Sequence, residues 1–110
     1  MTRSDDEHVA DILDTATEVA ALVAPSIDVW ENDLMRRLAV ERLLEITGES
    51  ARTLSERCRA RFPDVPWRDV VGLHVVLAHH YHRVDPRQVW TIANVELPRL
   101  VEVLRACPAN

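Results

Sequence analysis

Apolar side chains recur every three or four residues along almost the whole chain, which is the spacing of amphipathic helices. The first stripe predicts an acidic N-terminal helix over about residues 5–24, which Pro25 ends. A longer stripe begins at Leu34 and predicts one helix that reaches Arg61. Gly48 lies inside that helix at a cost of about 1 kcal/mol relative to alanine, which suggests that another helix approaches closely there.

The second half of the chain continues the helical pattern after a loop with two prolines at residues 62–66. The next predicted helix, about residues 66–82, is apolar on nearly all sides and should be buried in the core or in a subunit interface. Asp85 and Pro86 are typical of a helix start, and Pro98 should kink the helix that follows. We therefore expect an all-α, antiparallel bundle of four to five helices in a single domain over residues 1–110.

Composition supports this fold class and limits the location. The chain has 110 residues with only two glycines and one phenylalanine, which disfavours an all-β fold. It contains no long apolar run and no signal peptide, so we expect a cytoplasmic protein that does not enter a membrane. Its two cysteines, Cys58 and Cys107, are then expected to be reduced, and Cys58 fits a core position better than a nucleophile.

The charge is unevenly distributed. Residues 1–33 hold nine acidic residues and one basic residue, a net charge of −8, whereas residues 34–110 hold nine acidic and twelve basic residues, a net charge of +3. All thirteen basic residues are arginines, which codon preference in a GC-rich genome explains most simply. A dedicated duplex-DNA binder usually carries a strong basic stripe, so we expect no DNA partner, although a local anion site remains compatible with the charge.

Histidines cluster near the end of the predicted helix at about residues 66–82. Four of the five histidines, together with the only tyrosine, Tyr81, lie within residues 74–82: His74, His79, His80 and His82. Histidine titrates near neutral pH and serves as a general acid, a general base or a metal ligand. At 100° per residue, His74 and Tyr81 share a helix face, whereas His79 lies about 140° from His74. The two histidines can border one groove only if another helix, or a second copy across a two-fold axis, forms the other wall.

The segment from about Arg36 to Leu104 resembles the HepT-type toxins of the HEPN superfamily. The resemblance rests on three blocks in the family's order: residues 44–50 (LEITGES), residues 62–73 with Pro66-Trp67-Arg68-Asp69, and residues 74–81, followed by Val84-Asp85, Val89-Trp90 and Glu96-Leu97-Pro98. In the family's motif, Arg-x4-His-x-Tyr, His79 and Tyr81 take the histidine and tyrosine positions. His74 stands where the family has arginine.

The resemblance implies a HEPN-like symmetric homodimer that cleaves RNA, either tRNA or mRNA, in the dimer groove without metal or cofactor. It implies that His79 is a catalytic acid or base and that a protonated His74 replaces the cation that stabilises the phosphorane. Arg68 and Arg83 are candidates for a compensating cation by proximity. The chain would be the toxin of a toxin–antitoxin module. Its partner would be a nucleotidyltransferase antitoxin that transfers AMP from ATP to Tyr81.

Three alternatives remain open at this point. His79 and His82 lie three residues apart and could bind a metal ion with Asp85 and Cys58, although this spacing alone is a weak signal. The departure at His74 also fits a catalytically inactive dimer that acts as a protein-interaction module. Glu45 and Glu49 share one helix face and either line the groove, where they could orient His79, or form a solvated and internally paired surface.

Trp67 and Trp90 are expected to anchor the core, and Trp30 to cover one end of the bundle.

Overall fold

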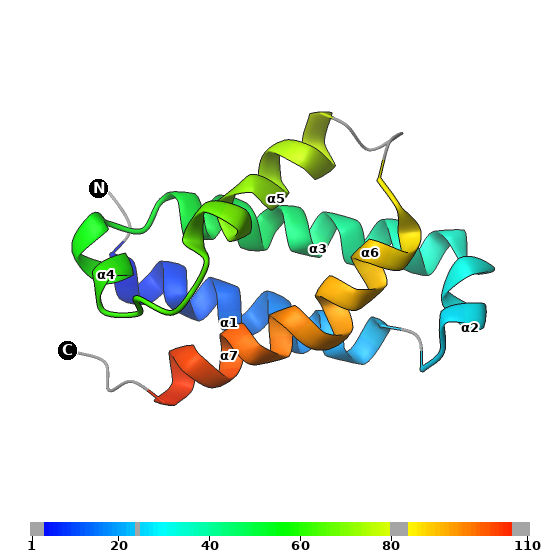
Figure 1. Ribbon diagram of the computed structural model, residues 1–110, viewed down its shortest axis with the longest axis horizontal. Helices are drawn as coiled ribbons and strands as arrows, with labels where there is room; N and C mark the ends of the chain where they lie inside the picture. The colour runs from blue at the N-terminus through cyan, green and yellow to red at the C-terminus, as the bar shows by residue number, and fades with distance from the viewer. Residues whose placement is uncertain (1–3, 24, 80–83, 107–110) are drawn as a thin grey trace.

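The computed structural model describes residues 4–23, 25–79 and 84–106, and within them all regular structure is helical. Three long helices and one composite rod make up the body (Figure 1). The long helices are α1 (Asp5–Leu22), α3 (Leu34–Arg52) and α5 (Trp67–His79); the rod consists of α6 (Pro86–Thr91), the π-helical segment η2 (Ile92–Glu96) and α7 (Leu97–Ala106). The short helices α2 (Ile27–Glu31) and α4 (Glu56–Ala60) lie at opposite ends of the molecule. The all-α fold class is confirmed for the described residues, and none of their helices is long and apolar enough to cross a membrane.

Helix α1 places the acidic residues of the N-terminus where a helix stabilises them. Ser4 and Glu7 form a capping box, and Asp5, Asp6 and Glu7 lie in the first turn. Negative charge at this end of a helix interacts favourably with its unpaired N–H groups. The helix ends at Leu22, close to the predicted limit, and buries Ile12 and its apolar neighbours against α3.

The prediction of one continuous helix from Leu34 to Arg61 is wrong beyond Arg52. Helix α3 ends at Arg52, and α4 begins separately at Glu56 after a short turn. Ser55 causes the break: its hydroxyl accepts a hydrogen bond from the Cys58 backbone N–H at 3.0 Å and caps α4. Asp5 of α1 holds Ser55 in place by accepting from the Ser55 backbone N–H at 2.9 Å and from its hydroxyl at 2.6 Å.

The final rod begins as predicted and is irregular just before Pro98. The Asp85 side chain accepts a hydrogen bond from the Arg87 backbone N–H at 3.0 Å, and Pro86 occupies the first turn of α6. The irregularity expected from Pro98 takes the form of the π-helical segment η2, in which the Leu97 N–H bonds to the Ile92 carbonyl. Proline has no N–H to donate, so a wider turn before Pro98 accommodates the missing bond.

The core lies between α1, α3 and the rod, and α5 covers one side of it with Leu77 and four partly buried side chains, those of Trp67, Val70, Val71 and Leu73. Trp30 is fully buried and donates its indole N–H to the Pro86 carbonyl at 2.7 Å, which ties α2 to α6. Cys58 is buried, as expected, and Trp67 and Trp90 pack against the core while half-buried. In α5 only Leu77 is buried, and Val75 and Val76 are 47% and 46% exposed. Helix α5 therefore packs on the core with one side only and is not enclosed by the described part of its own chain, and a subunit interface on its other side stays a prediction.

Candidate active site

Helix α5 packs mainly on α3, and the contact is closest where Gly48 faces His74. A Cβ atom added at Gly48 would lie 2.6 Å from the backbone nitrogen of His74 and 3.0 Å from the Val70 carbonyl oxygen. Such distances exclude any side chain unless α5 moves away. The close helix approach predicted from Gly48 is confirmed. It also fixes the position of His74 beside Gly48 along the axis of α3.

At this contact the His74 imidazole joins a short chain of charged groups. His74 Nε2 lies 3.2 Å from Oε2 of Glu49, and Glu49 accepts two hydrogen bonds from Arg52, at 3.1 Å and 2.5 Å. The hydrogen bond from Arg52 lowers the pKa of Glu49, and the positive charges of Arg52 and His74 act in the same direction against partial desolvation. His74 Nδ1 is buried and has no hydrogen-bond partner within the described residues. The arrangement suits the tautomer that donates from Nε2 to Glu49.

His79 is in a different environment. It is the last residue of α5, its side chain is exposed, and it makes no hydrogen bond or ion pair with the described residues. It lies five positions after His74 in the helix, which places the two residues about 7.5 Å apart along the helix axis and about 140° apart around it. One chain therefore does not bring the two histidines together, and Glu49 pairs with His74 rather than orienting His79.

The remaining predicted site residues are divided between α5 and a segment outside the description. Arg68 lies in the first turn of α5, is exposed, and forms no ion pair with described residues. Glu45 pairs with the exposed Arg42 at 2.9 Å, which fits an internally paired surface. Tyr81 and Arg83, like His80 and His82, lie outside the described residues.

The structure adds one site residue that sequence reasoning missed, Arg52. It contributes a permanent positive charge one step from His74, through Glu49. Its spacing of three residues after Glu49 was a visible signal, because oppositely charged residues three apart on a helix commonly pair. The signal did not show that a residue of α5 would join the pair.

The geometry of the described residues gives little support to the metal-binding alternative. Cys58 is 3% exposed, and burial is the main factor that raises the pKa of its thiol. Cys58 lies in α4, which precedes the first residue of α5, whereas His79 is the last residue of α5. The two residues therefore lie toward opposite ends of α5 in the chain. In the described part of the chain no group of three or more histidine, cysteine, aspartate or glutamate residues could hold a metal ion.

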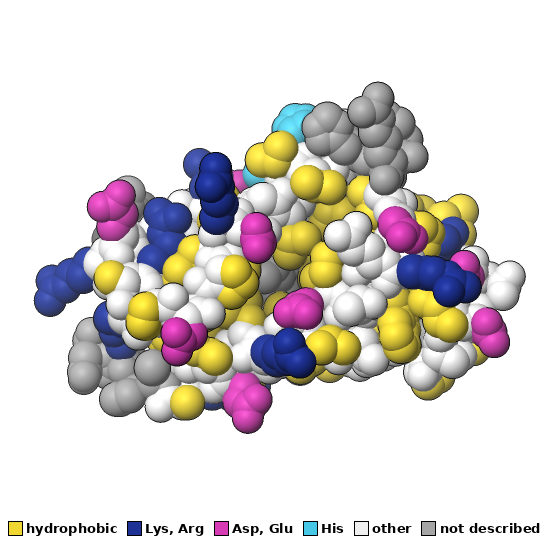
Figure 2. Space-filling model, viewed as in Figure 1, with side chains coloured by type: hydrophobic (Ala, Val, Ile, Leu, Met, Phe, Trp, Pro, Cys, Tyr) yellow, Lys and Arg dark blue, Asp and Glu magenta, His cyan; other side chains and the backbone are white. Residues whose placement is uncertain are grey.

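Hydrophobic side chains remain on the surface of α3 and α5. Besides Val75 and Val76, the exposed large hydrophobic residues include three in the first two turns of α3: Leu34, Met35 and Leu38. Figure 2 shows hydrophobic side chains gathered over α5 and beside it. Exposed apolar side chains that gather on one helix in this way are typical of an interaction site.

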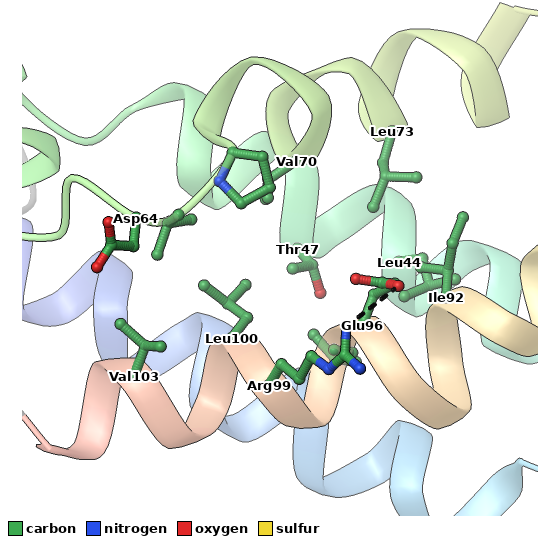
Figure 3. Close-up of a pocket in the computed structure, with 13 residues that line it drawn as sticks. Leu44, Thr47, Asp64, Val70, Leu73, Ile92, Glu96, Arg99, Leu100 and Val103 are labelled. Carbon is green, nitrogen blue, oxygen red and sulfur yellow. Dashed lines mark ion pairs between the residues drawn. The ribbon is translucent and has the colours of Figure 1, made fainter.

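A separate apolar groove of about 330 Å³ opens between α5 and the rod (Figure 3). Leu44 and Thr47 of α3 line its inner side, and an ion pair between Glu96 and Arg99, at 3.9 Å, lies at its solvent edge. Neither His74 nor His79 lines this groove. The groove and the two histidines are therefore distinct features of the molecule.

Comparison with known proteins identifies the family. The family model described as "Ribonuclease HepT-like" matches residues 9–107, so the chain belongs to the HepT-like ribonuclease family. It is 39% identical over 92 residues to "Putative RNase MJ1380" of Methanocaldococcus jannaschii, which covers 82% of this chain and 84% of that protein. It is 32% identical over 68 residues to "Probable ribonuclease HepT" of Thermococcus cleftensis, which covers 62% of each chain. No solved structure gives a significant match.

Proposed function

We propose that this chain is a metal-independent endoribonuclease that acts on RNA as a homodimer. Membership of a ribonuclease family and the names of its relatives support RNA as the substrate class. The observation that carries the proposal is His79, an exposed imidazole with no partner among the described residues, at the end of a helix on which Val75 and Val76 are about half exposed. An acid–base group at the border of an apolar interface is what a site shared by two copies requires.

The proposed reaction is a transfer of the phosphoryl group within the RNA chain. A base removes the proton of a 2′-hydroxyl, the 2′-oxygen attacks the adjacent phosphorus, and the 5′-oxygen leaves with a proton from an acid. The products are a 2′,3′-cyclic phosphate and a 5′-hydroxyl, and no metal is needed. His79 supplies the acid or base, since imidazole exchanges protons near neutral pH.

His74 is proposed as a second site residue, in the position of the family's arginine. When protonated it adds one positive charge to the cluster with Glu49 and Arg52. The Glu49 carboxylate offsets part of that charge, so His74 offers a phosphate less than a free arginine fork would. A further cation near His79 would therefore strengthen the site.

The biological role proposed with this activity is that of a cytoplasmic toxin in a toxin–antitoxin module. A nucleotidyltransferase antitoxin would transfer AMP from ATP to the Tyr81 hydroxyl and release pyrophosphate. The added phosphate carries negative charge and would repel the RNA backbone. Incubation with the antitoxin and ATP should add one AMP by mass spectrometry, and Tyr81→Phe should prevent the addition.

Cleavage of tRNA and mRNA in EDTA, over about pH 5.5 to 8, tests the enzymatic proposal. The wild-type protein should cleave, and His79→Ala should lower the rate by about a hundredfold or more. His8→Ala, which removes a histidine of α1, is the matched control and should leave the rate unchanged. Absence of cleavage from a folded dimer at every pH would overturn the proposal.

That negative outcome would favour a second function, a catalytically inactive dimer that binds a protein partner. The replacement of the family's arginine by His74 is the observation behind this alternative. The exposed apolar residues of α3 and α5 would then serve the partner rather than RNA.

A further inference from the structure

Four residues form one stripe along α5, on the side away from the Gly48 contact with α3: Arg68, Gly72, Val75 and His79. Arg68 and Gly72 also border an open groove between α5 and α6. Their spacing of four, three and four residues places them within about 60° of each other around the helix. Arg68, Val75 and His79 are exposed, and Gly72 is half-buried. The stripe points away from α3, which contacts the opposite side of α5 through Val70 and His74.

Gly72 is not explained by the packing of its own chain. A Cβ atom added there would meet nothing within 4 Å, in contrast to Gly48, where it would strike the backbone of α5. A glycine inside a helix costs about 1 kcal/mol relative to alanine. The absence of a side chain at this open position therefore suggests close approach by a helix outside the chain.

The stripe is symmetric about its own midpoint, halfway between residues 73 and 74. If two copies of α5 cross antiparallel at that midpoint, Gly72 faces the partner's Val75 and Arg68 faces the partner's His79. Each glycine then makes room for a valine, and the half-exposed valines become buried. A parallel crossing would instead place Arg68 against the partner's Arg68, which like-charge repulsion disfavours.

We propose that the active dimer has two equivalent phosphate sites, each built from Arg68 of one protomer and the partner's His79. This proposal rests on the ribonuclease function proposed above and names the cation that the substitution at His74 removes. The Arg68 guanidinium binds two phosphate oxygens and stabilises the charge on the phosphorane, while the partner's His79 transfers a proton. Because Arg68 has no ion pair among the described residues, its fork is available to RNA.

Mixing two inactive variants tests the shared site. Arg68→Ala and His79→Ala should each be inactive alone, since either change damages both sites of a dimer. Refolded together in equal amounts, half of the dimers are mixed, and each mixed dimer keeps one intact site. Recovery of about a quarter of the wild-type rate is therefore expected. A site built within one protomer gives no recovery, which would overturn the proposal.

Two matched variants define the role of Arg68. Arg105→Ala removes an exposed arginine from α7 and should leave cleavage unchanged. Arg68→Lys keeps the charge without the planar fork and should restore only part of the activity. Full activity of Arg68→Ala would show that Arg68 does not act on the phosphate.

A disulfide experiment tests the crossing even if the protein cleaves no RNA. In a variant with Cys58 and Cys107 changed to alanine, Gly72→Cys mixed with Val75→Cys should form disulfides between the two different variants. Disulfides formed within each single variant alone, but not between them, would indicate a parallel crossing and overturn the proposal. Hetero-disulfides without any cleavage by the wild type would keep the interface and reject the nuclease. Cleavage by the wild type without recovery of activity on mixing would keep the nuclease and reject the shared site.

Discussion

The backbone nitrogen of His74 lies 2.6 Å from where a methyl group on Gly48 would be, so helices α3 and α5 touch there through backbone rather than side chains. The next residue of α3, Glu49, reaches the His74 imidazole from the same turn. One glycine therefore sets both the distance between the helices and the environment of a proposed site residue. Any change that separates the helices should also move His74 away from Glu49.

Gly48→Ala should lower the free energy of unfolding. Alanine would gain up to about 1 kcal/mol in helix propensity, but the clash with α5 should cost about 1–3 kcal/mol, because backbone atoms cannot rotate away as a side chain can. Urea denaturation measures the difference. Gly72→Ala, studied at concentrations where the chain is monomeric, is the control and should be neutral or stabilising, because a Cβ atom there meets no other atom. Equal losses of stability in both variants would show that the clash at Gly48 is not the cause.

Thr47→Val should also lower stability, because Thr47 is fully buried in α3 and its hydroxyl joins two helices. That hydroxyl lies 3.0 Å from the Thr15 hydroxyl of α1 and donates to the Leu43 carbonyl at 3.0 Å. Valine has nearly the same shape and cannot make either bond, so we expect a decrease of about 1 kcal/mol by thermal or urea unfolding. Thr17→Val removes a similar bond, to Leu13, at an exposed position and should change stability by less than about 0.5 kcal/mol.

The contact between Asp5 and Ser55 should make stability depend on pH in the acid range. Hydrogen bonds from the Ser55 hydroxyl and backbone N–H lower the pKa of Asp5 below its ordinary value of 3.8. The stabilisation is therefore present above pH 3.8 and is lost as the pH falls through the lowered pKa of the folded state. Asp5→Ala should lower the free energy of unfolding by about 1 kcal/mol near neutral pH. The difference in this free energy between the variant and the wild type should shrink in acid. A difference that is constant over pH would contradict this assignment.

The features that sequence predicted well depend on neighbouring residues. Asp85 and Pro86 start a helix because a side chain caps the N–H groups next to it, and Pro98 disturbs the helix that contains it. The end of α3 was predicted wrongly because it depends on Asp5, fifty residues before Ser55 in the chain. No local pattern shows that an acid of the first helix will hold a serine of a later turn.

The candidate site follows the same division. Gly48 indicated a close helix approach, and the approach exists, but the pairing of Glu49 with His74 depends on the register of α5 against α3. A pattern that was apolar on nearly all sides of residues 66–82 did not distinguish a core helix from an interface helix. The structure shows one core-facing side, with Leu77, and one side on which Val75 and Val76 are about half exposed.

The salt dependence of RNA binding gives a measure of Arg68 that does not require cleavage. Each phosphate of single-stranded RNA that the protein neutralises adds about 0.7 to the slope of log affinity against log salt concentration, through the release of counterions. With an RNA methylated at its 2′-hydroxyls to prevent cleavage, Arg68→Ala should reduce the magnitude of the slope by about 0.7 for each phosphate that Arg68 binds in the wild-type protein. Arg68→Lys should keep the slope, because the charge remains, while its cleavage rate falls for lack of the planar fork. Arg105→Ala should leave both quantities unchanged, and an unchanged slope in Arg68→Ala would remove Arg68 from the phosphate site.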